Sequence, residues 1–184
     1  AIPSMRHLDM PMRLRALLRS GFEPGVIHDI GAARGEWARL AASVWPHAAI
    51  VGFEPNARER ASLDATASTL AKFSYHICFL GEREGEVRYE DKGTQTSVLD
   101  AGGASGAAVA SMHRLDALIA EGRVAPPGFL KLDVQGYELE VLRGAEQAMR
   151  GARAVLLEVS FEEFFPGVPT VENVVAFLDA RGYA

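Results

Sequence analysis

Acidic side chains stand at or near the ends of several short apolar segments of this chain. The four that we consider as site candidates are Asp29, Glu54, Asp133 and Glu158. In an open α/β sheet, ligands bind beyond the carboxyl ends of the strands, so acids placed there are expected to gather around one crevice. Such a carboxylate can accept a proton, pair with an ammonium group or hydrogen-bond to a ribose diol.

Asp29 belongs to a strand–turn–helix pattern. Residues 26–30 are mostly apolar, Gly31 and Gly35 follow, and a helical period begins directly after them. The spacing Asp-x-Gly-x-x-x-Gly lacks the middle glycine of a dinucleotide fingerprint, because Ala33 stands there, and no P-loop sequence follows. An acid two residues before the first glycine can pair with an ammonium group, which favours a nucleotide that carries an amino acid. The alternative is an ordinary β–α turn without a ligand.

Glu54 closes the second apolar segment, about twenty residues beyond the glycine turn. Nucleotide-binding folds place there the carboxylate that binds the ribose hydroxyls, and its two acceptor oxygens match a vicinal diol. The alternative is that Glu54 caps a surface turn. Asn56 and Glu59 form a predicted capping box for the next helix.

Asp133 ends a further apolar segment, and Gly136 turns the chain into a helix. We expect Asp133 to act as a general base; its alternative role is to bind the N–H groups of the following turn.

Glu158 lies within the fifth apolar segment, where an unpaired charge would be expensive. We therefore expect it near the strand end, facing the site or a partner. Glu138 and His113 are further candidates for the base.

The whole pattern alternates strands and helices, which predicts an α/β fold with a doubly wound, mostly parallel sheet. Residues 86–90 are expected to form an edge or hairpin strand, and 91–111 a mobile loop or substrate flap. The chain thus divides into an N-terminal helical segment, 1–24, and a Rossmann-like domain, 25–184. Strands are expected at residues 26–30, 49–53, 73–80, 129–133 and 154–161, and the main helices at 9–20, 36–44, 56–70, 136–149 and 170–181.

The composition predicts a protein with a sizeable core and no membrane span. The hydrophobic share is 48% and the formal net charge is −5, which argues against nucleic acid as the main partner. No apolar run reaches about eighteen residues, and the N-terminus shows no signal-peptide pattern. The single cysteine, Cys78, lies in an apolar run and predicts a buried thiol in a reducing compartment such as the cytoplasm. No cluster of histidine and cysteine predicts a metal site.

Four stretches of sequence resemble one family. They read Asp-Ile-Gly-Ala-Ala-Arg-Gly-Glu-Trp, Gly-Phe-Glu-Pro-Asn, Leu-Lys-Leu-Asp-Val-Gln-Gly-Tyr-Glu-Leu-Glu-Val-Leu-Arg-Gly-Ala and Leu-Leu-Glu-Val-Ser-Phe. In this order they closely resemble the FkbM-type S-adenosylmethionine-dependent methyltransferases. The resemblance implies a class I methyltransferase fold, S-adenosyl-L-methionine as cofactor and O-methylation of a hydroxyl on a natural product, sugar or glycan.

The resemblance also implies roles for particular residues. Asp133 would face the methyl group, while Leu80 and Gly81 would lie near the adenine. For methyl transfer to a hydroxyl group, we expect Asp133 as the base and Glu158 as the next catalytic candidate. The methionine end and the ribose would be lined by Asp29, Gly31, Ala32, Gly35, Trp37, Glu54 and Pro55.

In one respect the chain departs from the family pattern. The family's sheet normally finishes with an antiparallel hairpin after the last helix, and the sequence stops before it. We therefore expect a sheet edge that is bare or covered by a partner, which allows a homo-oligomer.

Two other functions are compatible with parts of this pattern. One is a non-catalytic S-adenosylmethionine-binding module or an inactive partner subunit. The other is a nicotinamide-dependent oxidoreductase, which the glycine spacing disfavours.

Overall fold

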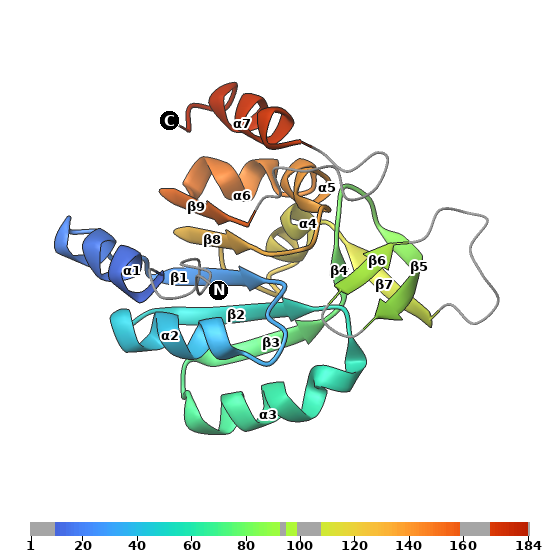
Figure 1. Cartoon of the computed structure of the whole chain (residues 1–184), viewed down its shortest axis with the longest axis horizontal. Helices are drawn as coiled ribbons and strands as arrows, with labels where there is room; N and C mark the ends of the chain where they lie inside the picture. The colour runs from blue at the N-terminus through green and yellow to red at the C-terminus, as the bar shows by residue number, and fades with distance from the viewer. Residues whose placement is uncertain (1–9, 93–94, 99–107, 159–169, 184) are drawn as a thin grey trace, which may run out of the picture.

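The computed structural model describes residues 10–92, 95–98, 108–158 and 170–183 (Figure 1). Its centre is a five-stranded sheet in which every pairing is parallel. The order across this sheet is β3 (Phe73–Ile77), β2 (Ala49–Glu54), β1 (Val26–Ile30), β8 (Phe129–Leu132) and β9 (Ala154–Leu157). The predicted mostly parallel sheet is confirmed.

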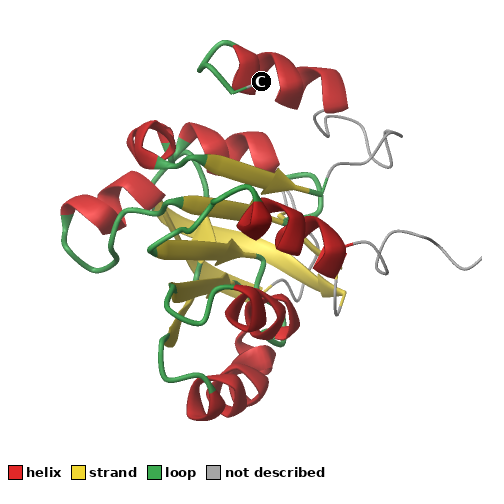
Figure 2. Cartoon of the chain, turned by 90° about the vertical axis from the view of Figure 1, so that its left-hand side faces the viewer, coloured by secondary structure: helices red, strands yellow, loops and turns green. Residues whose placement is uncertain are grey.

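Helices cover both faces of this sheet, as Figure 2 shows from the side. One face packs on α1 (Met10–Arg19), α2 (Glu36–Val44) and α3 (Arg60–Thr69) through a cluster that includes Ile27, Leu63 and Phe129. The other face packs on α4 (Leu115–Ala120), α5 (Glu138–Arg143), α6 (Glu146–Gly151) and α7 (Val171–Asp179). Side chains alternate between the faces along each strand, so Asp29 shares the α2 face with Ile27.

A second sheet includes part of the region 91–111, so the prediction of one long loop is wrong for the described residues of that region. The order is β4 (Phe79–Leu80), β7 (Ala108–His113), β5 (Gly85–Lys92) and β6 (Gln95–Val98), with β5 antiparallel to both neighbours. The edge or hairpin strand predicted at 86–90 is confirmed as part of β5. Val87 and Met112 pack with Phe79 in a small core of their own. Residues 93–94 and 99–107 lie outside the described part, and so does any flap formed there.

Three further boundaries differ from the predictions. The strand expected at 73–80 divides at Cys78, because Cys78 N still donates to Glu54 O whereas Leu80 pairs with β7. The helix expected at 136–149 divides into α5 and α6 at Gly144, where a Cβ would lie 1.9 Å from the carbonyl oxygen of Gly81. The strand expected at 154–161 ends at Leu157, and residues 159–161 are not described.

Two local predictions concern caps and the thiol. Asn56 caps the short 3-10 helix η1 (Ala57–Glu59) by accepting from Arg58 N, and the Glu59 carboxylate pairs instead with Arg34. The predicted capping box at this place is therefore wrong. Cys78 is buried and free, and burial raises the pKa of its thiol to about 12, as expected for an inert core cysteine.

Candidate functional site

The predicted acids fall into two successive rows across the sheet. In the lower row, Asp29 lies between Gly52 on β2 and Lys131 on β8. Two residues further along each strand stand Glu54, Gly31, Asp133 and Glu158. Asp133 N donates to Ile30 O and Glu158 N donates to Leu132 O, each at 3.0 Å, so the register continues beyond the strands. Residues two apart share a face, which puts this carboxylate row at the carboxyl edge, on the α2 side.

Glycine is needed at both positions of the turn between β1 and α2. Gly31 has φ +79°, and a Cβ there would lie 1.9 Å from Asp133 O. Gly35 has φ +74° at the N-cap of α2, and a Cβ there would lie 2.8 Å from Thr66 Oγ1. The turn is thus packed directly against its neighbours on both sides.

The N–H groups of this turn bond within the protein. Gly31 N and Ala32 N both donate to Phe53 O, and Gly35 N donates to Ala32 O. Ala33 N donates to Glu54 Oε2 at 2.8 Å. These donors are therefore not free to cradle a phosphate, which agrees with the absence of a dinucleotide fingerprint.

Ala33 takes the position of the missing middle glycine and keeps a left-handed conformation, with φ +45°. Ala33→Gly should therefore raise the free energy of unfolding by up to about 1 kcal/mol, since relief of strain outweighs the larger entropy of the unfolded chain. Urea unfolding measures the change. Ala42→Gly, inside α2, is the matched control and should lower the same quantity by about 1 kcal/mol. A loss at both positions would contradict the strain at Ala33.

Glu54 is 7% exposed and ties the turn to β2. Its Oε2 accepts from Ala33 N and its Oε1 accepts from Asn56 N at 2.9 Å. Burial raises the pKa of Glu54, and the two backbone hydrogen bonds oppose that rise. Each oxygen keeps a further lone pair. Both the turn-capping role and the diol role are thus compatible with this position, and Pro55 follows in the same turn.

Lys131 joins the two rows, and sequence reasoning missed it. Its Nζ lies 2.9 Å from Asp29 Oδ1, donates to Gly31 O at 2.9 Å and lies 3.7 Å from Asp133 Oδ2. Asp29 is fully buried; burial raises its pKa and Lys131 opposes the rise. An ammonium group of the chain itself therefore lies beside Asp29, the residue that we predicted to pair with the ammonium group of a cofactor. The sequence feature that could have indicated Lys131 as a site residue is the position of a lysine within the apolar run Phe-Leu-Lys-Leu.

Trp37, predicted near the methionine end, covers Lys131. Its ring centroid lies 5.9 Å from Lys131 Nζ and 5.9 Å from the ring of Phe129. Its Nε1 is buried without a hydrogen-bond partner in the described part of the chain.

The turn after β8 is held by Glu138. Its buried carboxylate accepts from Val134 N at 3.4 Å and from Gly136 N at 3.2 Å, and burial raises its pKa. Gln135 has φ +54° and donates through Nε2 to Asp133 Oδ1 at 3.0 Å. The turn-binding role considered for Asp133 is therefore filled by Glu138, which makes Glu138 a poorer candidate for the base.

The other predicted residues lie farther along the chain. Glu158 follows β9 and is exposed, in agreement with a place near the strand end. Leu80 is buried in the core and Gly81 N donates to His113 O, so both belong to the second sheet. His113 Nδ1 lies 2.8 Å from Glu84 Oε2, and no contact within the described residues joins it to Asp133.

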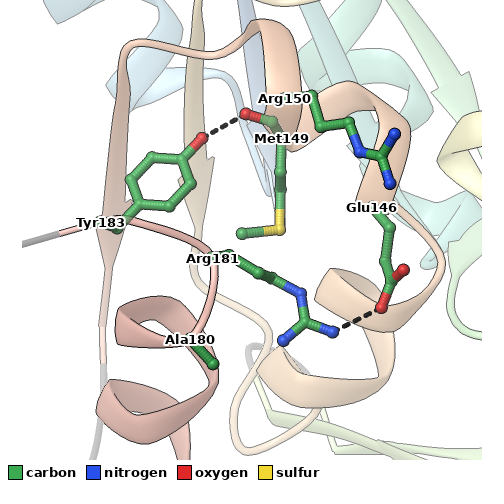
Figure 3. Close-up of a pocket in the computed structure, with 6 residues that line it drawn as sticks. All are labelled: Glu146, Met149, Arg150, Ala180, Arg181 and Tyr183. Atoms are coloured by element: carbon green, nitrogen blue, oxygen red, sulfur yellow. Dashed lines mark hydrogen bonds and ion pairs between the residues drawn. The ribbon is translucent and has the colours of Figure 1, made fainter.

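A pocket of about 360 Å³ lies elsewhere, between α6 and α7 (Figure 3). Arg181 pairs there with Glu146, and Tyr183 donates to Met149 O. Both helices cover the sheet face opposite to α2, so this pocket contains none of the predicted site residues.

Within the described ranges, no helix is long and apolar enough to cross a membrane. Nor does the same part of the chain hold three His, Cys, Asp or Glu side chains grouped as a metal would need.

The chain is similar to known methyltransferases. Residues 29–184 match the family described as Methyltransferase FkbM domain. The hexuronic acid methyltransferase AglP of Haloferax volcanii is 27% identical over 150 residues, which are 79% of this chain and 60% of AglP. The chain therefore spans about three fifths of the length of that relative.

A solved structure shows the same fold. The precorrin-6y C5,15-methyltransferase of Geobacter metallireducens aligns with a TM-score of 0.56 at 14% identity, covering 100% of this chain and 76% of that protein. At this identity the likeness concerns the fold alone.

Proposed function

Since the chain belongs to the FkbM methyltransferase family, we propose that it transfers a methyl group from S-adenosyl-L-methionine to a hydroxyl group of a sugar, glycan or other small natural product. The observation that carries the proposal is the carboxylate row. Glu54 ends β2, and Asp133 and Glu158 directly follow β8 and β9, all in register and beside the glycine turn. Ligands of open α/β sheets bind at this edge.

The residues at this edge fit such a donor. Glu54 has a lone pair left on each oxygen for a ribose diol, and the N–H groups of Gly31, Ala32, Ala33 and Gly35 already donate within the protein. A nucleoside with an amino-acid tail needs acceptors for its hydroxyl and ammonium groups. Carbonyl and carboxylate oxygens, such as those of Gly31 and Asp133, supply them.

The proposed base is Asp133. When bound, the donor supplies an electrophilic methyl group on a sulfonium. As the new O–C bond forms and the S–C bond breaks, Asp133 accepts the proton of the acceptor hydroxyl. Asp133 is half-buried at the strand end, and its Oδ1 accepts a hydrogen bond from Gln135 Nε2. Glu158 lies one strand away and would bind the acceptor or assist the same proton transfer.

The relative suggests a first acceptor to test. Because AglP is named for hexuronic acid, oligosaccharides that contain glucuronic acid are the first probe, and neutral oligosaccharides of equal length the second. Calorimetry with S-adenosylmethionine and S-adenosylhomocysteine (SAH) should show one site, and mass spectrometry should show a gain of one methyl group. Lack of binding would reject the proposal. Binding without methylation of a broad panel of hydroxyl acceptors would favour a non-catalytic module.

Glu54→Gln should weaken the binding of SAH about tenfold or more. The loss of charge-assisted hydrogen bonds to a ribose diol supplies an effect of this size. Calorimetry at fixed pH gives the dissociation constant. Glu59→Gln, which removes the partly exposed ion pair with Arg34 but none of the hydrogen bonds of Glu54, is the control and should change the affinity by less than about threefold. Equal affinities for wild type and Glu54→Gln would exclude the ribose role.

A further inference from the structure

The buried ammonium group of Lys131 lies next to the carboxylate row of Glu54, Asp133 and Glu158, two residues earlier along the strands. Lys131 is 6% exposed, and its Cα partner across the β1–β8 pair is Asp29, which is 0% exposed. A buried lysine needs a counterion, and the Oδ1 of Asp29 at 2.9 Å provides it. The pair by itself would explain only stability.

The same ammonium group also contacts residues at the carboxyl edge of the sheet. It donates to the carbonyl oxygen of Gly31 at 2.9 Å and lies 3.7 Å from Asp133 Oδ2. One side chain therefore contacts the glycine turn of β1 and the proposed base of β8. No other described residue has polar contacts with Asp29, Gly31 and Asp133 at once.

Asp29, in contrast, is 0% exposed and is flanked in the sheet by Gly52 and Lys131. Lys131 lies on one side of it, and on the other a Cβ at Gly52 would lie 3.1 Å from Ala32 Cβ and from the ring of Phe73. The ring of Trp37 covers Lys131 at 5.9 Å. A donor molecule at the edge would meet Gly31 O and Asp133 before it could reach Asp29.

We propose that Lys131 is a positioning residue of the donor site, which fixes the Gly31 carbonyl and the Asp133 carboxylate, and that Asp29 acts on the donor only through Lys131. The proposal rests on the proposed function. It reassigns the acid before the first glycine from a direct ligand of the donor's amino group to the counterion of an internal lysine. The Gly31 carbonyl, with one lone pair taken by Lys131, presents its second lone pair to the amino-acid end of the donor.

The test compares two probes that differ at that end. SAH carries the amino acid, whereas 5′-methylthioadenosine lacks it. Their affinity ratio is measured by calorimetry for wild type, Lys131→Met, Asp29→Asn and the double variant. A variant that only loosens the fold should lower the affinities for both probes by the same factor and leave their ratio unchanged. We expect Lys131→Met to lower the ratio about tenfold, as for the loss of a charge-assisted hydrogen bond.

The double variant separates direct from indirect action. If Asp29 acts through Lys131, Asp29→Asn has no further effect on the ratio once Lys131 is methionine. An equal fall in both backgrounds would overturn the proposal, as would a ratio unchanged in Lys131→Met. Should Lys131→Met not fold, Lys131→Gln takes its place, since glutamine keeps an N–H donor but no charge. A wild type that binds neither probe would overturn the proposed function as well.

Discussion

Asp133→Asn is expected to lower kcat by about 10²–10⁴, the range found when one general base is removed, while SAH still binds. Asparagine has nearly the shape of aspartate but cannot accept the hydroxyl proton. Gln135 and Lys131 still surround the side chain, so the turn should keep its conformation. The measurement is methyl transfer to the acceptor found with the oligosaccharide panel, with SAH affinity from calorimetry. Asp179→Asn, exposed on α7, is the matched control.

Full turnover of Asp133→Asn would remove Asp133 from the role of base. The next variant would then be Glu158→Gln, because Glu158 occupies the same row one strand further on. Loss of SAH binding together with turnover would instead mean that the carboxylate mainly holds the donor.

Gly31→Ala is expected to lower the free energy of unfolding by about 2–5 kcal/mol, a large part of the stability of an ordinary domain. The Cβ would lie 1.9 Å from Asp133 O, which forces β1 and β8 apart, and the φ of +79° is unfavourable for alanine. Urea unfolding followed by circular dichroism gives the change.

Gly21→Ala isolates the contact in this experiment. Gly21 has φ +83° but nothing lies within 4 Å of a Cβ built there. This control should therefore show only the conformational part, about 1–2 kcal/mol. Equal losses for the two variants would show that the close approach of Gly31 to Asp133 contributes nothing.

The sequence was sufficient to predict the central sheet and the acids at its edge. Apolar runs such as Val26–Ile30 and Phe129–Leu132 stand out locally, and the glycines mark where each one turns. Because parallel strands align their carboxyl ends, the neighbourhood of Glu54 and Asp133 follows from strand order alone.

What could not be predicted depends on contacts between distant segments. The strand Ala108–His113 is short and rich in small residues, so its own sequence favours a strand only weakly. Its pairing with β5 stabilises it. The break at Gly144 lies where Gly81 O comes so close that a Cβ would be 1.9 Å from it, a contact that no local pattern shows. Lys131 was overlooked for the same reason. The role of Lys131 depends on the register that places Asp29 opposite it, and this register is known only from the folded sheet.

The buried carboxylate of Glu138 has a consequence for the turnover cycle. It takes up the N–H groups of Val134 and Gly136, so the loop after β8 does not rely on Asp133 for its shape. A base must gain and lose a proton in every cycle, and a carboxylate that also anchored the loop would loosen it each time. In the proposed mechanism, the two acids, five residues apart, therefore have different roles: Glu138 holds the loop, and Asp133 is the proposed proton acceptor.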